Sequence, residues 1–140
     1  MIEDSLTSLH RSIQKCRKCR LSETRTNAVP GEGPPNARIM FVGEAPGEEE
    51  DKDGRPFRGR SGHFLDELLS TVGMTRDEIY ITSSVKCRPP GNRDPRPDEL
   101  KACRETWLEQ QIEILDPELI VLLGKTALYQ VLGETGPLRE

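Results

Sequence analysis

Three short apolar segments separated by helical segments restrict this chain to few folds. The apolar segments cover residues 38–43, 79–82 and 119–123, and turn residues bound the first of them. Short apolar runs of this kind fit buried strands. Strands that alternate with helices favour a parallel sheet with helices packed against it. We therefore expect an α/β fold with a short, mainly parallel sheet.

The helices are predicted from apolar spacing and from capping residues. A first helix is expected over residues 3–15, and a second begins at Ser61 and stops at Gly73. Thr75 and Glu78 have the spacing of a capping box that starts a single turn. The remaining expectations are a helix from Pro97 to Leu115, a last helix with Ala127, Leu128, Val131 and Leu132, and loops over 44–60 and 88–97.

Length and charge describe one domain with local basic surfaces. With 140 residues, the chain is expected to form a single domain over residues 1–140. Its net charge of −4 excludes a simple polycationic binder of nucleic acid. Basic residues nevertheless gather at 11–20, 55–60 and 86–96, which favours a polyanionic partner. No apolar run approaches the ~20 residues of a membrane span, and no signal peptide is evident, so we expect a cytoplasmic protein without a membrane partner.

The loop after residue 43 is the first candidate site, because ligands of parallel sheets bind beyond the carboxyl ends of the strands. Gly43 and Gly47 allow a backbone to approach a ligand closely, and Glu44 places a carboxylate beside them. Phe57 is an aromatic residue in a polar loop. It either stacks on a nucleobase or anchors the loop in the core.

The start of the following helix is a weaker candidate. Gly59, Arg60, Ser61 and Gly62 open a helix whose N-terminal amides suit a phosphate. His63 lies in the first turn beside this loop, and His10 is isolated. We expect both histidines at the surface.

Four cysteines suggest a metal site. Cys16 and Cys19 form a C-x2-C pair among basic residues, which are expected to lower the thiol pKa. Cys87 follows a strand and Cys103 lies in the next helix, so the chain can bring the second pair together. Four thiolates hold zinc or an iron–sulfur cluster. The alternative for Cys103 is a buried free thiol on an apolar helix face.

Several motifs occur together from Cys16 to the end of the chain. They are C-x2-C, NAVPGEG, IMFVGEAPGEEED, GRPF, GRSG, YITSSVKCRPPGNRDPRP and VLLGKTAL. This combination is highly specific. With it the chain resembles the family-4 uracil-DNA glycosylases, the iron–sulfur type found in archaea and thermophilic bacteria.

The resemblance implies a three-layer αβα sandwich and a DNA repair enzyme. The reaction would hydrolyse the N-glycosidic bond of deoxyuridine in DNA and leave an abasic site. Glu44 would stabilise the developing sugar cation, directly or by orienting a water molecule. The uracil pocket would comprise Gly43, Glu44, Ala45 and Phe57, with Phe57 stacked on the flipped base. A structural [4Fe-4S] cluster would be bound by Cys16, Cys19, Cys87 and Cys103. The DNA-contacting residues among the basic clusters would be Arg58, Arg60, Ser61, Arg88 and Arg93.

Two departures from the family pattern affect these expectations. The family's second strand ends Ile-Thr-Asn, and the Asn reads the uracil edge, whereas this chain has Ser83 there. A hydroxyl offers fewer hydrogen bonds than an amide, so another deaminated base is a second candidate substrate. The family also has a further strand and a His-Pro-Ser/Ala motif beyond a segment like residues 133–140. We therefore expect the last strand to be lacking here.

Two other functions fit part of the sequence. A non-catalytic iron–sulfur module that binds DNA would keep the fold and the cluster without the chemistry. A small iron–sulfur electron carrier fits less well, because the cysteines lack the dense spacing of ferredoxins.

Overall fold

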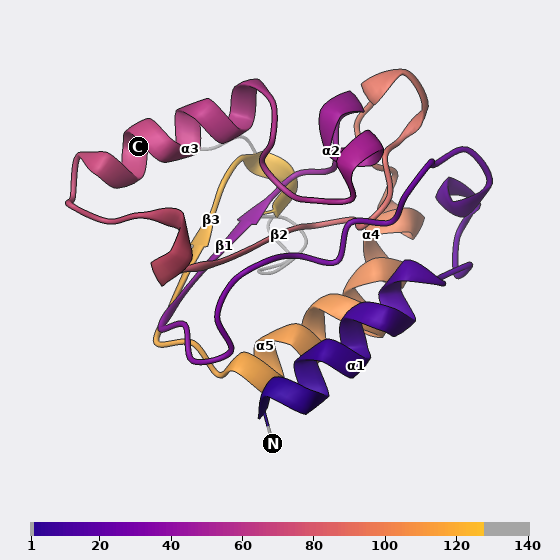
Figure 1. Cartoon of the computed structure of the whole chain (residues 1–140). Coiled ribbons are helices and arrows are strands. Elements are labelled where there is room, and N and C mark those ends of the chain that lie inside the picture. Colours follow the sequence, from indigo (N-terminus) through magenta and orange to yellow (C-terminus); the bar gives the residue numbers. More distant parts are fainter. Residues whose placement is uncertain (1, 128–140) are drawn as a thin grey trace.

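A computed structural model of the chain describes residues 2–127. Its centre is a sheet of three parallel strands: β1 (Ile39–Gly43), β2 (Tyr80–Ser83) and β3 (Leu119–Leu122). The strand order is β2-β1-β3, so β1 lies in the middle (Figure 1). The predicted parallel sheet is confirmed, and each strand lies within one residue of its expected position.

The helices form two layers on the sheet. Figure 1 shows α1 and α5 side by side on one face and α3 on the other. Alternate residues of β1 explain this division, since Met40 and Val42 pack toward α1 and α5 whereas Phe41 packs toward α3. The three-layer α/β fold is thereby confirmed. The helices are α1 (Ile2–Gln14), α2 (Glu48–Asp53), α3 (Arg60–Ser70), α4 (Pro97–Cys103) and α5 (Glu109–Leu115).

Short helical turns complete the architecture. A π-helical turn, Arg104–Leu108, joins α4 to α5, so the helix predicted from Pro97 to Leu115 is continuous but locally widened. The capping box of Thr75 and Glu78 is confirmed, with the Thr75 amide donating to the Glu78 carboxylate at 2.7 Å. This turn is Arg76–Glu78, and two further 3-10 turns cover Arg20–Glu23 and Pro90–Asn92.

Two expectations about the segment 44–62 are wrong. It is not a continuous loop, because α2 forms within it. Helix α3 begins at Arg60 with Gly59 as N-cap, and the Ser61 side chain does not cap it. The helix α2 has no apolar periodicity; its four consecutive acidic residues lie at the positive end of the helix dipole. The predicted last helix falls mainly on residues 128–140, outside the described residues.

His10 is not the surface residue that its isolation suggested. The ring is half-buried under β2, and Nε2 lies 2.6 Å from the Tyr80 hydroxyl. The Tyr80 oxygen also accepts a hydrogen bond from the Gln111 amide at 2.9 Å. A hydroxyl oxygen can accept two hydrogen bonds, so the tautomer of His10 decides which of the two groups donates in their contact. His63 is exposed, as expected.

Acid is expected to destabilise the fold through His10. Burial, and then the charge of Lys86, hold the pKa of His10 below its usual value of 6.5. Below pH 6.5 His10 is protonated to a greater extent in the unfolded chain than in the folded chain. The free energy of unfolding therefore falls as the pH falls below 6.5, and it is unaffected at higher pH. The slope will stay below the ~1.4 kcal/mol per pH unit of one whole proton.

Urea unfolding of the wild-type protein and of His10→Gln, at pH 7.5 and pH 5.5, measures this effect. Gln retains a hydrogen-bond acceptor without titrating, so the variant should lose less stability between the two pH values. Equal losses in both proteins would exclude His10 as the source.

Candidate functional site

The carboxyl ends of the strands place the predicted pocket residues together. Gly43 and Ser83 are register partners at the ends of β1 and β2. Beyond them, the amide and hydroxyl of Ser84 donate to the Gly43 carbonyl at 2.8 and 2.9 Å. The Val85 amide then reaches the Glu44 carbonyl at 3.4 Å. The loop after β1 is therefore bound to the loop after β2, and Gly43, Glu44 and Ser83 lie at one edge of the sheet.

Glu44 lies where loops from all three strands meet. Its side chain is exposed, as contact with a ligand requires. Partial burial of the carboxyl group, and then a hydrogen bond and charge repulsion from Asp94, raise the pKa of Glu44, and a hydrogen bond with Thr126 opposes the increase. Asp94 follows β2 and Thr126 follows β3. A carboxyl group whose pKa is raised by burial and by a second carboxyl group is typical of acid–base and cation-stabilising sites.

Phe57 covers the end of β1. A Cβ atom on Gly43 would lie 2.7 Å from Cζ of Phe57, so only glycine lets the ring approach this closely. The same ring belongs to the hydrophobic cluster of Phe41, Leu65 and Ile81. Phe57 is thus a core anchor of its loop, the alternative weighed from the sequence, and its ring also borders the predicted pocket. A base-stacking role remains a prediction.

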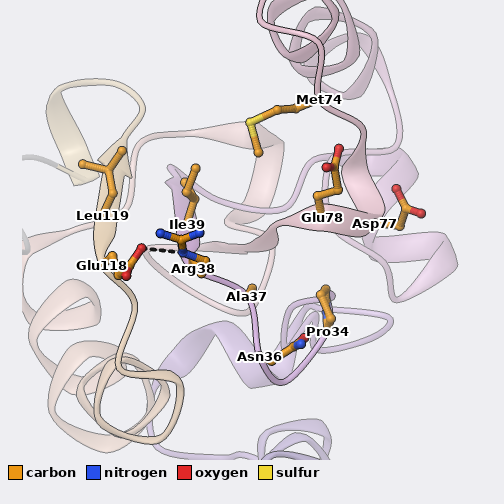
Figure 2. A pocket seen from close by; sticks show the side chains of 10 residues that line it. All are labelled: Pro34, Asn36, Ala37, Arg38, Ile39, Met74, Asp77, Glu78, Glu118 and Leu119. Carbon is orange, nitrogen blue, oxygen red and sulfur yellow. Dashed lines mark hydrogen bonds and ion pairs between the residues drawn. The ribbon is translucent and has the colours of Figure 1, made fainter.

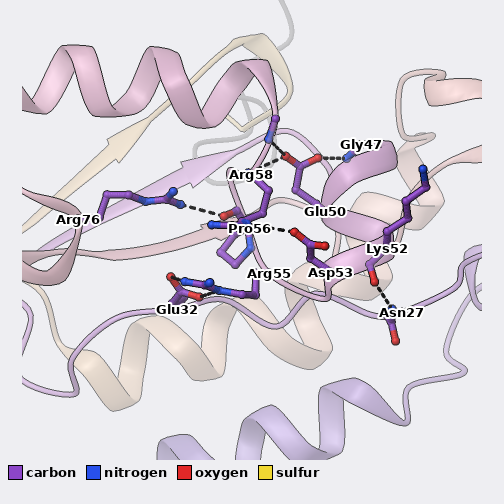
Figure 3. A network of polar contacts seen from close by, with 11 residues as sticks. Asn27, Glu32, Gly47, Glu50, Lys52, Asp53, Arg55, Pro56, Arg58 and Arg76 are labelled. Carbon is purple, nitrogen blue, oxygen red and sulfur yellow. Dashed lines mark hydrogen bonds and ion pairs between the residues drawn. The ribbon is translucent and has the colours of Figure 1, made fainter.

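The loop that carries Phe57 is fixed by polar contacts on several sides. Figure 3 shows this network, in which Arg55 forms a bidentate ion pair with Glu32 at 2.6 and 2.9 Å. Arg76 donates to the Pro56 carbonyl at 2.9 Å. Glu50, in α2, accepts hydrogen bonds from backbone amides of the loop. No apolar pattern in the sequence predicts these polar contacts.

The residues predicted to contact DNA differ in whether their side chains already bind other residues of the protein. Arg60 and Ser61 are exposed at the start of α3. Arg58 pairs with Asp53 at 3.1 Å, and Arg88 donates to Asn92 at 2.7 Å. Arg93 is held by the fully buried Glu99 through two bonds of 2.8 and 2.9 Å, so it serves the structure of the loop after Cys87. Their contacts with DNA remain predictions.

The four cysteines lie close together. Cys16, Cys19, Cys87 and Cys103 line one cavity and belong to one core cluster with Trp107. All four are free thiols. The spacing argument for a return of the chain from β2 into the next helix is therefore confirmed.

Two sulfur atoms of this cluster accept hydrogen bonds from nitrogen. The Trp107 indole donates to Cys16 Sγ at 3.0 Å, and the Arg25 guanidinium donates to Cys87 Sγ at 3.1 Å. The fully buried Lys86 lies beside the cavity, and burial lowers its pKa to about 8. Donors and a cation around four thiols suit anionic sulfur, which is what a metal centre requires.

The pKa expectation for the first cysteine pair is wrong at Cys19. Burial raises the pKa of Cys19 and of Cys87, where the Arg25 hydrogen bond opposes the increase. Burial also raises the pKa of Cys103 to about 12, against the opposing charge of Lys86. Basic neighbours in the sequence do not lower the pKa of Cys19, because its sulfur is withdrawn from water.

The arrangement of thiols bears on the kind of metal centre. Within residues 2–127, no three cysteine, histidine or carboxylate side chains are grouped to hold a metal ion. Four thiols around one cavity are a donor set that zinc and iron–sulfur clusters both use.

A wide hollow lies at the other end of the sheet. Figure 2 shows it at the start of β1 and β3, beside Ile39 and Leu119. Its volume is about 660 Å³. An ion pair between Arg38 and Glu118, 2.6 Å long, crosses its wall. The amino ends of parallel strands are not where such sheets bind ligands. We therefore do not place the active site there.

These features define an α/β protein with a candidate ligand site at the carboxyl ends of a parallel sheet and with a cluster of four cysteines. Among residues 2–127, no helix is both long and apolar enough to cross a membrane. Residues 30–138 match the sequence profile of the uracil DNA glycosylase superfamily, and the chain belongs to that superfamily.

Several relatives that are similar to this chain carry the name uracil-DNA glycosylase. The chain is 50% identical over 134 residues to the Type-4 uracil-DNA glycosylase of Sulfurisphaera tokodaii, covering 95% of this chain and 60% of that protein. It is 52% identical over 126 residues to the Type-4 enzyme of Thermotoga maritima, covering 90% and 65%. The Type-5 uracil-DNA glycosylase of Thermus thermophilus is 38% identical over 123 residues, covering 77% and 54%. The chain thus spans about three fifths of the length of these relatives.

Sequence reasoning missed Asp94 and Glu50. Asp94 stands in the predicted loop 88–97, and only the fold brings it beside Glu44. A carboxylate between two arginines in a proline-rich loop, Arg93 and Arg96, was the available signal. Glu50 was hidden in a run of four acids, of which the fold buries Glu50 and Asp51 and leaves the first two exposed.

Proposed function

We propose that the protein is a uracil-DNA glycosylase that hydrolyses the N-glycosidic bond of deoxyuridine in DNA and leaves an abasic site. The observation that carries the proposal is the meeting of Glu44, Gly43, Phe57 and Ser83 at the carboxyl end of the sheet in a member of this superfamily. A flipped uracil would lie beyond the end of β1, against the exposed part of the Phe57 ring and beside the loop from Gly43 to Ala45.

Glu44 is the proposed catalytic residue. Breaking the glycosidic bond leaves positive charge on the sugar and negative charge on the departing base. An ionised carboxylate stabilises the sugar cation, and it can orient the water that attacks it. Ser83 offers its hydroxyl to the base at the position where the resembling family has an amide.

The proposed cofactor is a [4Fe-4S] cluster bound by Cys16, Cys19, Cys87 and Cys103, with zinc as the alternative. Bound there, it would supply a cross-link between the segment after α1, the loop after β2 and the end of α4. Trp107 and Arg25 would hold the thiolates in place through their hydrogen bonds to sulfur. A group that requires free thiols fits a reducing compartment, which supports a cytoplasmic location.

DNA that contains uracil or another deaminated base is the proposed partner. Arg60 and Ser61 open α3 beside the Phe57 loop and are exposed to a phosphate. Arg58 and Arg88 are tied to polar neighbours and would exchange those contacts for phosphates on binding. Arg93 would act mainly by holding its loop through Glu99.

An abasic-site assay tests the proposed activity. Anaerobically purified protein is incubated with a labelled oligonucleotide that holds one deoxyuridine, single-stranded or as a U:G or U:A pair, and then treated with alkali. Cleavage at the uracil position is expected, and an identical oligonucleotide with thymine is the control. Absence of cleavage by protein that binds the oligonucleotide and has its visible absorbance would overturn the proposal in favour of a DNA-binding module.

Replacing Ser83 by asparagine is expected to raise uracil excision about tenfold, the effect of one additional hydrogen bond of ~1.4 kcal/mol in the transition state. Ser83 is buried at the end of β2, opposite Gly43, so the longer amide would extend toward the pocket. Single-turnover rates on uracil and on hypoxanthine measure the change. Ser84→Asn, at the adjacent buried position, serves as a control for packing effects.

A further inference from the structure

Phe57 has an unusual backbone conformation for its residue type. Its φ of 53° lies in the left-handed region, which a bulky side chain rarely occupies. Residues held there cluster at binding sites and persist only where their surroundings enforce them. The contacts that enforce this conformation are therefore of functional interest.

The surroundings of Phe57 tolerate little movement. A Cβ atom on Gly62 would lie 2.1 Å from the Phe57 carbonyl oxygen, and one on Gly43 would lie 2.7 Å from the tip of the ring. The missing side chain of Gly62 leaves room for the Phe57 backbone, and that of Gly43 leaves room for the Phe57 ring. The ring therefore has one position, directly over the end of β1.

Glu50 holds the backbone that follows Phe57. Its Oε2 atom accepts hydrogen bonds from the amides of Arg58 and Gly59 at 2.8 and 3.0 Å (Figure 3). Its Oε1 atom accepts the Gly47 amide at 2.8 Å. One carboxylate thus joins both ends of the segment from Gly47 to Gly59.

The burial of Glu50 shows that this contact is built into the fold. The side chain is 7% exposed, although burying a carboxylate is costly unless hydrogen bonds replace its water. Burial alone would raise the pKa of Glu50, but the amides of Gly59, Arg58 and Gly47 outweigh it and keep the pKa below its usual value. Glu50 is therefore ionised at neutral pH, and its charge strengthens all three bonds.

We propose that Glu50 is a positioning residue of the base pocket, which holds Phe57 in its left-handed conformation so that the ring is ready to receive a flipped base. The proposal rests on the function proposed above, in which Phe57 stacks on uracil. Glu50 acts only through the loop, since its oxygens are occupied by backbone amides. Its loss should therefore affect the rate of excision more than the binding of DNA.

Asp51 provides a matched control in the same helix. It is 4% exposed and accepts the amides of Thr26 and Asn27 at 2.8 and 3.1 Å, so it also joins α2 to a loop. That loop does not carry Phe57. If a substitution acts by weakening α2 in general, substitutions of Glu50 and of Asp51 should have the same effect. If it acts on the ring of Phe57, only the substitution of Glu50 should have an effect.

The position of the ring is measured by ¹⁹F NMR of protein with 4-fluorophenylalanine at position 57. In Glu50→Gln the amide nitrogen faces at least one backbone N–H, and the resonance is expected to shift and broaden. Asp51→Asn and Glu49→Gln, the latter at an exposed position, should leave it unchanged. If Glu50→Gln does not fold, Glu50→Asp keeps the charge but withdraws the carboxylate, and should give a smaller shift.

The kinetic test is a double-mutant cycle with Phe57→Ala. Glu50→Gln alone is expected to lower kcat for uracil excision about tenfold to a hundredfold, the effect of misplacing a group by less than 1 Å, with KM changed less than about threefold. In the Phe57→Ala background the same substitution should have no further effect on kcat.

The outcomes separate this inference from the proposed function. An unchanged fluorine signal in folded Glu50→Gln, or additive losses in the cycle, would overturn the positioning role even if the wild-type protein excises uracil. A shifted signal in a protein that excises no uracil would show that Glu50 positions Phe57 but that the proposed function has failed.

Discussion

Replacing Glu44 by glutamine is expected to lower uracil excision about a thousandfold, within the 10²–10⁴ range of a positioned acid–base group. The amide retains the size of the side chain but cannot stabilise a sugar cation. Single-turnover excision at pH 8 measures the loss. Glu48→Gln, at an exposed position of α2, is the control for a general effect of charge. Full activity in Glu44→Gln would remove the proposed role.

The pH dependence of excision will reveal the pairing of Glu44 with Asp94. Partial burial and the Asp94 carboxyl raise the pKa of Glu44, so the ionised, active form is lost as pH falls through that raised value. In Asp94→Asn the repulsion disappears, and the acid limb of the rate profile should move to lower pH. A limb that stays in place, or moves to higher pH, would show that Asp94 does not act on the catalytic group.

Loss of a single cysteine is expected to remove the metal centre and to weaken the whole fold. Cys16 follows α1 and Cys103 ends α4, so a group that both bind connects segments far apart in the chain. Without it, the melting temperature should fall by about 10 °C, corresponding to a loss of a few kcal/mol. The visible absorbance, the iron and sulfide content and thermal unfolding of Cys16→Ser and Cys103→Ser measure this effect.

Lys101→Ser is the control for the cysteine variants, because Lys101 is exposed on the same helix as Cys103. It should retain both the absorbance and the melting temperature of the wild-type protein. Iron and sulfide at the wild-type level in both cysteine variants would contradict the proposed ligand set. One zinc ion per chain in the wild-type protein would establish the alternative metal.

Apolar periodicity was sufficient to predict the sheet and most helices, because β1 and α3 are stabilised by packing against one core. It could not reveal α2, whose formation depends on acids at its amino end and on the buried hydrogen bonds of Glu50 and Asp51. These are contacts with distant backbone amides, and they have no periodic signature in the sequence.

The sequence predicted several residues of the candidate site but not which of them contact one another. Strand ends identified Gly43, Glu44 and Ser83, because parallel strands bring their carboxyl ends to one edge. The partner of Glu44 was not predictable, since Asp94 reaches it through a proline-rich loop whose path depends on the Arg93–Glu99 pair. The pKa of Cys19 was also misjudged, because burial follows from tertiary packing and not from the neighbouring residues.

The position of β1 at the centre of the sheet also has a consequence for synthesis of the protein. Its pairing partners lie 40 residues later, in β2, and 80 residues later, in β3. At ~5–20 residues per second, a ribosome leaves one edge of this apolar strand unpaired for several seconds after the other edge is satisfied. Such long-range parallel pairing is slow to form. The nascent chain therefore acquires its β1–β2 half first, and its exposure to mispairing ends only when β3 has left the ribosome.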